Sequence, residues 1–207
     1  MKIKKVNNYH TDENAYIIWD EATKNGVVID PGYKADGILK SAQDDGVNIR
    51  YILLTHCHYD HIAFANPLKE LTDAQIVTGV KGKINCADPD INLTKHGLGH
   101  EIIVKADMVL KDQEILKLND LKFKCIETPG HTNCSVCFLC GEHLFCGDTL
   151  FLRNVGRWDL PTGDEDALIF SIRQKLYTLD ESITAHPGHG EDTTIGYEKK
   201  YNLYVKG

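Results

Sequence analysis

The sequence predicts an α+β protein in which two β-sheets are covered by helices. The expected elements run twice from strands to a helix, and each half ends in a loop that carries histidines. The long alternation of single strands and helices that builds a doubly wound parallel sheet is absent. No linker or shift in composition divides the 207 residues, so we expect residues 1–207 to form one domain with a large core.

The first half is expected to contain four strands and two helices. One apolar run stops at Asp30-Pro31-Gly32, which is a turn signal. Residues 51–54 form a continuous apolar run, which is typical of a strand buried on both faces. The predicted strands are residues 15–19, 27–29, 51–54 and 75–78, and the predicted helices are residues 38–43 and 61–71.

The second half begins with a predicted surface loop, residues 86–101, which contains Asp88-Pro89-Asp90 and two glycines. A hairpin with its turn at Gly141-Glu142-His143 is expected further along the chain. The predicted strands are residues 115–118, 121–127, 135–140, 144–146 and, last, 182–185, and residues 168–179 have the pattern of an amphipathic helix.

Composition excludes several classes of partner and compartment. The net charge is −7 and there is no Lys/Arg tract, so no nucleic-acid partner is expected. No apolar run approaches the roughly 20 residues that span a bilayer, so no membrane partner is expected. Seven cysteines are an odd number for a disulfide framework, and we interpret them as reduced thiols in a cytoplasmic protein.

The segment directly after the buried run at residues 51–54 carries the strongest chemical signal. His56, His58, Asp60 and His61 lie within six residues. In extended backbone His56 and His58 point to the same side and can bind one metal ion together. A turn into a helix would carry Asp60 and His61 toward a second ion. Imidazole and carboxylate donors suit zinc, iron or manganese.

Three further turns have the same character. His131, Asp148 and His189 each follow a predicted strand in a glycine-containing turn. A single such turn would be weak evidence, whereas four segments with metal-ligand chemistry in one domain predict one composite site.

These residues, in this order, resemble the metallo-β-lactamase superfamily. The similarity extends from the turn at Asp30 to Gly190. Within the superfamily the chain looks most like the glyoxalase II-like (hydroxyacylglutathione hydrolase-like) enzymes, because of residues 128–138, 147–151 and 156–161. The resemblance implies a four-layer αββα sandwich as a single domain. In one respect we expect a departure from glyoxalase II: the helical C-terminal domain that helps that enzyme to bind glutathione is expected to be absent here.

The resemblance also implies a ligand set. A first metal would be bound by His56, His58 and His131, and a second by Asp60, His61 and His189. Asp148 would bridge the two ions. Asp30 would orient a ligand imidazole through a hydrogen bond. An aspartate at 148, where dinuclear β-lactamases usually carry cysteine, argues against lactam hydrolysis.

The predicted function is metal-dependent hydrolysis of a small-molecule thioester. Two divalent ions would hold a bridging hydroxide and aim it at the carbonyl carbon. Zinc is the expected metal, and iron and manganese are the alternatives. Asp60 or Asp148 would accept a proton from the nucleophile. A thiolate leaves with little protonation, so no separate general acid is required.

Two alternatives stay open at this point. Persulfide dioxygenases share the fold and use one iron, which His56, His131 and Asp148 would hold here. A non-catalytic metal-binding protein on the same fold is the other alternative, and the presence of all seven ligand-type residues speaks against it.

Several other residues have structural interpretations. Cys134, Cys137 and Cys140 have the spacing of an iron–sulfur motif, but alternation along a strand would turn Cys137 away from the other two. We therefore expect small buried hydrophobes. The remaining expectations concern residues outside the ligand set. Cys57 points away from the metals, His186 makes a supporting hydrogen bond, and surface or loop roles are expected for His10, His96, His100 and His143. Arg157 is expected to pair with Asp159, with contact to an anionic substrate as the alternative, and a helix at residues 197–204 is expected to pack its tyrosines on the domain.

Overall fold

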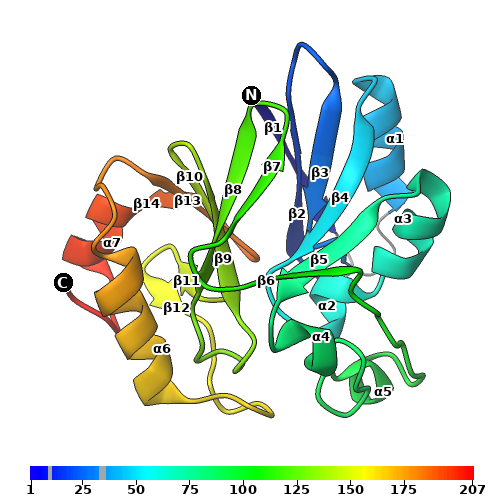
Figure 1. Cartoon of the computed structure of the whole chain (residues 1–207). Coiled ribbons are helices and arrows are strands. Elements are labelled where there is room, and N and C mark those ends of the chain that lie inside the picture. Colours follow the sequence, from blue (N-terminus) through cyan, green and yellow to red (C-terminus); the bar gives the residue numbers. More distant parts are fainter. Residues whose placement is uncertain (9–10, 33–35) are drawn as a thin grey trace.

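The computed structural model describes residues 1–8, 11–32 and 36–207 of the chain, and most of its strands form two six-stranded sheets (Figure 1). The strand order is β1-β2-β3-β4-β5-β6 in the first sheet and β14-β13-β10-β9-β8-β7 in the second. The first sheet consists of β1 (Lys2–Asn8), β2 (Glu13–Trp19), β3 (Asn25–Ile29), β4 (Asn48–Leu54), β5 (Gln75–Gly79) and β6 (Met108–Leu110). The second consists of β7 (Ile115–Leu118), β8 (Leu121–Glu127), β9 (Val136–Cys140), β10 (His143–Gly147), β13 (Thr184–Pro187) and β14 (Thr193–Thr194), while β11 (Leu150–Phe151) and β12 (Asn154–Val155) form a separate ribbon.

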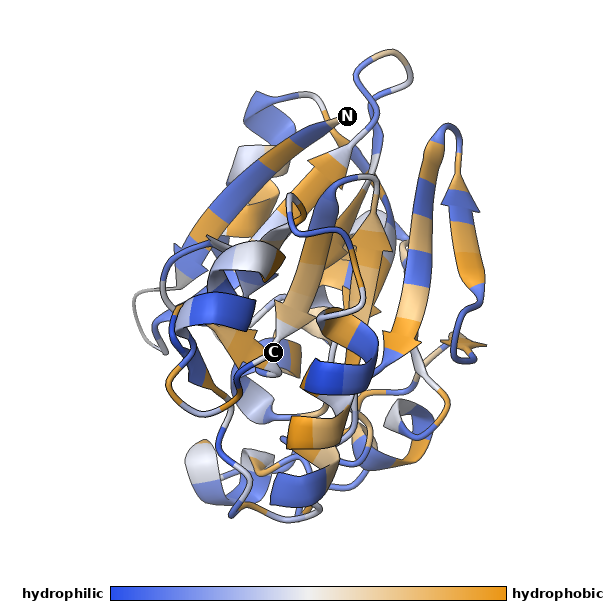
Figure 2. Cartoon of the chain, turned by 90° about the vertical axis from the view of Figure 1, so that its left-hand side faces the viewer, coloured by the Kyte–Doolittle hydropathy of each residue, from blue (hydrophilic) through white to orange (hydrophobic). Residues whose placement is uncertain are grey.

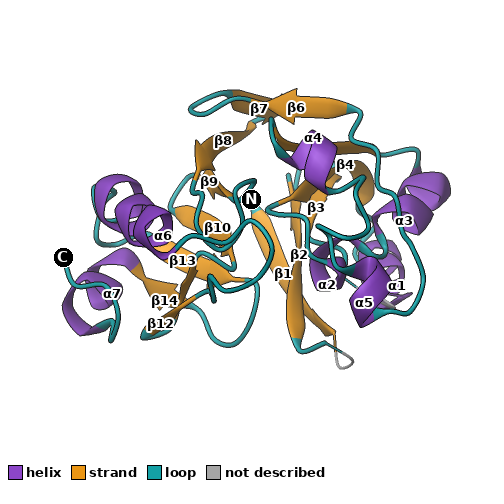
Figure 3. Cartoon of the chain, turned by 90° about the horizontal axis from the view of Figure 1, so that it is seen from below, coloured by secondary structure: helices purple, strands orange, loops and turns teal. Residues whose placement is uncertain are grey.

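Helices cover the outer face of each sheet, and the view in Figure 3 shows the resulting four layers. Beside the first sheet lie α1 (Asp36–Asp44), α2 (Tyr59–Ile62), α3 (Ala65–Thr72), α4 (Gly82–Asn85) and α5 (Thr94–Gly97). Beside the second lie α6 (Glu165–Ser171), its π-helical continuation η1 (Ile172–Leu176), and α7 (Ile195–Tyr201). No helix in the described ranges is long and apolar enough to cross a membrane.

The apolar residues form three clusters because side chains alternate between the two faces of a strand. Ile17 and Leu54 pack under the helices of the first sheet. Phe123 and Phe138 lie between the sheets, and Leu144 lies under α6. In Figure 2 the strands of the sandwich are mostly orange, whereas the helices in front carry blue stretches. The predicted αββα sandwich is therefore confirmed.

The predicted helix over residues 61–71 is wrong in one respect, because the structure divides it into α2 and α3. Phe64 leaves the helical conformation, with φ of −96° and ψ of 3°. Its N–H donates to the carbonyl of Pro31 at 3.0 Å. The break leaves α2 as a single short turn that carries two of the candidate ligands, Asp60 and His61.

The predicted surface loop at residues 86–101 is only partly a surface loop. It contains α5, and Cys86, Asn92 and Thr94 are buried. Their polar groups bond to one another across the loop, which the composition of the segment did not indicate. Five strands were not predicted, namely β1, β6, β11, β12 and β14. The strand expected at residues 182–185 corresponds to β13, and it is not the last strand because β14 follows it.

The C-terminal helices also differ from the prediction in detail. The helix expected at residue 168 begins at Glu165, because Asp164 caps it by accepting the N–H of Ala167 at 2.9 Å. The expected helix near the C-terminus is present as α7, but Tyr197 and Tyr201 stay exposed and stack on each other with ring centroids 4.8 Å apart. The prediction that these tyrosines pack on the domain was wrong.

The seven cysteines are all free and buried. Cys134 lies in the cluster under the first sheet's helices, Cys140 between the sheets, and Cys137 under α6. Three thiols in three separate clusters cannot converge on one iron–sulfur centre, so their interpretation as small buried hydrophobes is confirmed. Cys57 lies in the same cluster as Cys134, as expected for a side chain turned into the core.

The turn before His131 depends on a glycine that no other residue can replace without strain. Gly130 has φ of +148°, and a Cβ atom there would collide with the backbone of Leu168 in α6. We predict that Gly130→Ala lowers the free energy of unfolding by about 2–4 kcal/mol, because α6 must move away from the turn. Denaturant unfolding of the metal-free protein measures this change.

Gly37→Ala is the matched control. Gly37 is exposed in α1, and among the described residues an added Cβ would meet only Val6, at 3.7 Å. Alanine should stabilise this helix by about 0.5–1 kcal/mol. Equal unfolding free energies for the Gly130→Ala variant and the wild type would contradict the packing argument.

Candidate metal centre

The candidate ligands lie together because each follows the carboxyl end of a strand at one edge of the sandwich. His56 and His58 follow β4, and the chain then enters α2 with Asp60 and His61. His131, Asp148 and His189 follow β8, β10 and β13 respectively. Because β10 and β13 are parallel, and β8 runs in the same direction as β10, these ends meet.

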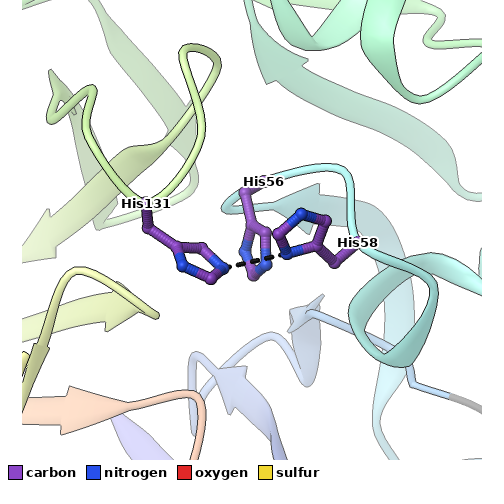
Figure 4. A group of neighbouring side chains, drawn as sticks. All are labelled: His56, His58 and His131. Carbon is purple, nitrogen blue, oxygen red and sulfur yellow. Dashed lines mark hydrogen bonds between the residues drawn. The ribbon is translucent and has the colours of Figure 1, made fainter. Parts of the chain in front are cut away.

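Three histidines form the first group of donors. Ring nitrogens of His56, His58 and His131 all lie within 4.8 Å of one another (Figure 4). Nδ1 of His58 is 2.9 Å from Nε2 of His131. All three side chains are buried. Zinc–nitrogen distances of about 2.0–2.1 Å would fit between nitrogens at such separations with small adjustments of the side chains.

Asp60, His61 and His189 form the second group, whose donor atoms also lie within 4.8 Å of one another. Oδ2 of Asp60 is 3.3 Å from Nε2 of His189 and 3.9 Å from Nε2 of His61.

Asp148 lies between the two groups. Its Oδ1 is 3.4 Å from Nε2 of His61, and its Oδ2 is 3.6 Å from both Nε2 of His131 and Nε2 of His189. One carboxylate therefore faces donors of both groups. The structure brings together all seven residues that the sequence singled out.

Buried atoms without hydrogen-bond partners indicate which kind of ligand these residues can bind. Within the described part of the chain, Nε2 of His56, Nε2 of His61 and Oδ1 of Asp148 are buried and lack such a partner. Unpaired buried polar atoms are costly, and nitrogen and oxygen donors of this kind bind divalent transition-metal ions. The donor set therefore fits divalent metal ions.

The protonation states favour the same conclusion. Burial, together with the neighbouring imidazoles, lowers the pKa of His56 well below its usual value and that of His58 to about 3. Both rings are therefore neutral and offer a lone pair. Burial opposes the charge on His61 as well, but the carboxylates of Asp148 and Asp60 outweigh it and raise the pKa of His61. A metal ion bound here would replace the proton on that ring.

A set of hydrogen bonds fixes the outward-facing nitrogens of the ligand rings. Oδ2 of Asp30 is 3.0 Å from Nδ1 of His61, and Asp30 also accepts the N–H and O–H of Thr55. The hydroxyl of Thr55 lies 3.1 Å from Nδ1 of His56. Asp30 therefore orients one ligand ring directly and a second through Thr55, which confirms its expected supporting role.

Two further rings are held by backbone carbonyls that sequence reasoning missed, whereas Nε2 of the fifth ring, His58, has no hydrogen-bond partner among the described residues. Nδ1 of His131 lies 2.6 Å from the carbonyl of Arg157, and Nδ1 of His189 lies 2.9 Å from that of Asp12. A carbonyl is present at every position, so no residue type could have marked these two.

Five of the seven donors line a cavity of about 490 Å³, namely His58, Asp60, His131, Asp148 and His189. The side chains of Tyr59, Leu93, Phe151 and Leu160 contribute apolar walls, and Arg157 lies at the rim. A volume of this size suits a small-molecule ligand. None of the four was predicted to line the cavity, because isolated apolar residues in loops and very short elements carry no periodic signal.

The supporting residues lie largely as expected. Arg157 forms an exposed bidentate pair with Asp159, with nitrogen–oxygen distances of 2.7 and 2.8 Å. Nδ1 of His186 lies 2.9 Å from Asp192, and its Nε2 lies 2.9 Å from His143. His143 is thus part of a supporting network as well as near a turn. His96 and His100 are exposed, and His10 lies outside the described residues.

Comparison with known proteins gives consistent relatives. The profile of the metallo-beta-lactamase superfamily matches residues 10–193. Hydroxyacylglutathione hydrolase GloC from Haemophilus influenzae is 36% identical over 199 residues, which cover 93% of this chain and 92% of that protein.

Solved structures agree with this assignment. The BLEG-1 B3 metallo-beta-lactamase superposes with a TM-score of 0.92 at 30% identity, covering 100% of both chains. ETHE1 from Myxococcus xanthus gives 0.85 at 28% identity, covering 99% of this chain and 84% of its own. TTHA1623, crystallised in a di-iron-bound form, gives 0.83 at 32% identity, covering 98% and 100%.

The hydrogen bonds of Asp30 generate a prediction about metal affinity. Asp30→Asn leaves the size of the side chain unchanged. Asp30 has a left-handed backbone conformation, with φ of 51°, which asparagine also adopts. The substitution places an amide N–H where the carboxylate now accepts from Thr55 and His61. Zinc affinity should fall about 10–100-fold, measured by competition with a chromophoric chelator.

Asp159→Asn is the control, because Asp159 is exposed and pairs only with Arg157 among the described residues. Its zinc affinity should equal that of the wild type. If Asp30→Asn binds zinc as tightly as this control does, Asp30 does not orient the ligands.

Proposed function

The chain belongs to the metallo-beta-lactamase superfamily, and we propose from this premise that it is a metal-dependent hydrolase that cleaves thioesters. The observation that carries the proposal is the position of Asp148 between two groups of buried donors. This geometry supports a centre for two divalent ions that share one carboxylate.

The proposed ligand set has three parts. His56, His58 and His131 would hold the first ion, and Asp60, His61 and His189 the second, with Asp148 shared between them. Two divalent ions, which we propose to be zinc with iron or manganese as alternatives, would supply an activated water at neutral pH and polarise a substrate carbonyl.

The chain's own residues would position the reactants and handle the proton. The carboxylates of Asp60 and Asp148 both line the cavity, so either is placed to accept a proton from the attacking water. The hydrogen bonds of Asp30, of Thr55 and of the two backbone carbonyls hold four of the five ligand rings in fixed orientations. Tyr59 and Phe151 contribute aromatic side chains to the lining of the cavity.

Because the proposed leaving group is a thiolate, the site needs no separate general acid. A free thiol has a pKa of about 8.5, so a thiolate departs with little help from an acid. GloC from Haemophilus influenzae, named a hydroxyacylglutathione hydrolase, supports the choice of a thioester substrate. We further propose that the substrate is a small molecule, with no nucleic-acid or membrane partner, and that the free cysteines reflect a cytoplasmic location.

Two other activities are candidates because of specific observations. The likeness to the BLEG-1 B3 metallo-beta-lactamase makes lactam hydrolysis a candidate, although an aspartate at position 148 argues against it. The subset His56, His131 and Asp148 would suit a single iron in a persulfide dioxygenase-like oxidoreductase.

One experiment separates these functions. The protein is purified without added metal, its metal content is measured, and it is assayed with S-D-lactoylglutathione, with a cephalosporin and with glutathione persulfide under oxygen monitoring. Two metal ions per chain and thioester cleavage support the proposal. One iron with oxygen uptake, or lactam cleavage without thioester cleavage, would overturn it.

The shared carboxylate generates a further prediction. Asp148→Asn removes the charge that faces both donor groups while keeping the shape of the side chain. Thioester hydrolysis should fall on the order of a thousandfold or more, because the activated water loses its defined position. Metal content should fall from two ions toward one, since the first group keeps three imidazoles.

Circular dichroism should show an unchanged fold, because Asp148 lies at a strand end outside the apolar clusters. Asp166→Asn, an exposed substitution in the first turn of α6, serves as the control and should keep full activity and metal content. If the Asp148→Asn variant still binds two ions and hydrolyses thioesters at the wild-type rate, the shared-carboxylate mechanism must be abandoned.

A further inference from the structure

One wall of the metal cavity contains a leucine in an unfavourable backbone conformation. Leu93 has φ of 64° and ψ of 10°, which is the left-handed region. Glycine, asparagine and aspartate adopt this conformation readily, whereas a leucine there is strained by its Cβ atom. Such strain persists only where the surrounding structure enforces it, and it concentrates at ligand-binding sites.

Two buried neighbours enforce the conformation of Leu93. The side chain of Asn92 donates to the carbonyls of Cys86 at 3.0 Å and Ile102 at 2.9 Å. The hydroxyl of Thr94 accepts the N–H of Ile102 at 3.0 Å. Asn92 and Thr94 both have no exposed surface. The loop is therefore anchored on either side of Leu93, while Leu93 itself is only half-buried.

The anchored loop is also tied to the ligand segment. The thiol of Cys57, which lies between His56 and His58, is 4.0 Å from the carbonyl of Ile91. Gly97 of α5 lies so close to the ring of Tyr59 that a Cβ atom there would collide with it. Leu93 and Tyr59 both line the cavity that holds the donors, and we call these two side chains the Leu93–Tyr59 wall.

The rim near Arg157 is mixed in character. Arg157 lines both the metal cavity and a neighbouring cavity of about 420 Å³, whose lining combines the polar Asn154 and Asp159 with the aromatic Trp158 and Tyr204. The exposed charges of Arg157 and Asp159 suit the polar thiol-bearing half of a substrate. A thioester whose polar half lies there and whose carbonyl lies at the donors would direct its acyl chain toward the Leu93–Tyr59 wall.

We propose that Leu93 is a specificity-determining residue that selects thioesters with an apolar acyl chain. The inference rests on the proposed thioester hydrolysis and adds the class of acyl group. The strained backbone holds the isobutyl side chain of Leu93 in the cavity, where it contacts the alkyl chain of the substrate. Longer, unsubstituted acyl groups are thus better substrates than short or hydroxylated ones.

The test compares four S-acyl glutathione thioesters on the zinc-loaded enzyme: acetyl, D-lactoyl, butanoyl and hexanoyl. Each buried CH₂ group favours binding about fourfold. Allowing for the open side of the cavity, kcat/KM for butanoyl should exceed that for acetyl and for D-lactoyl by about tenfold.

Two variants of Leu93 remove the apolar contact without strain. Leu93→Gly suits the left-handed backbone and deletes the side chain, and Leu93→Asn suits it and replaces the alkyl group with an amide. Both should fold and bind zinc as the wild type does, and the butanoyl preference should fall to about twofold or less. Ile103→Ala, at an exposed residue of the same loop outside the cavity, should keep the full preference.

A binding measurement separates this inference from the proposed reaction. Calorimetric titration of the zinc-loaded protein with acetate, butanoate and hexanoate requires no turnover. Tighter binding of the longer carboxylates, lost in Leu93→Gly and retained in Ile103→Ala, supports the Leu93–Tyr59 wall even if no thioester is hydrolysed. Equal binding of the three carboxylates, or a chain-length preference that survives in Leu93→Gly, would overturn it.

Discussion

The structure depends on the requirement that crowded, buried imidazoles and carboxylates be satisfied. Seven such side chains converge at the edge of an apolar sandwich, and several of their facing atoms have no hydrogen-bond partner within the described chain. Positive charge satisfies several lone pairs at once, and the carboxylates of Asp148 and Asp60 raise the pKa of the His61 ring against the effect of its burial, which favours a proton there. Divalent ions supply positive charge more completely, since each can accept several donors.

The turns of the chain make this crowding sterically feasible. Gly188 sits where a Cβ atom would collide with Asp148 and His61, and one at Gly156 would collide with the backbone of Asp148. These glycines allow the turns after β10 and β13 to approach closely. The three apolar clusters, which lie away from this edge, stabilise the fold. The donors at the edge can therefore be arranged for chemistry.

The sequence predicted which seven side chains come together, because each follows a strand that its own apolar pattern reveals. The break between α2 and α3 was missed, because it depends on Phe64 bonding to the distant carbonyl of Pro31. The two-residue strands β11 and β12 exist only through pairing with each other, and Leu93 enters the cavity through bonds made by its neighbours. Interactions between distant segments leave no periodic trace in a sequence.

The difference between the donors, which the sequence predicted, and the cavity walls, which it did not, bears on how selectivity arises in the superfamily. Proteins with names as different as BLEG-1 B3 metallo-beta-lactamase and hydroxyacylglutathione hydrolase GloC share the fold or the sequence pattern of this chain. A fold shared so widely does not choose a substrate. The choice must lie in the walls of the cavity, which come from the loop around Leu93 and the segment from Phe151 to Leu160. Both lie outside the two six-stranded sheets, so their side chains can change without altering the strands that carry the donors. Their backbones are held in place, because the carbonyl of Arg157 orients the ring of His131 and the bonds of Asn92 and Thr94 anchor the loop around Leu93.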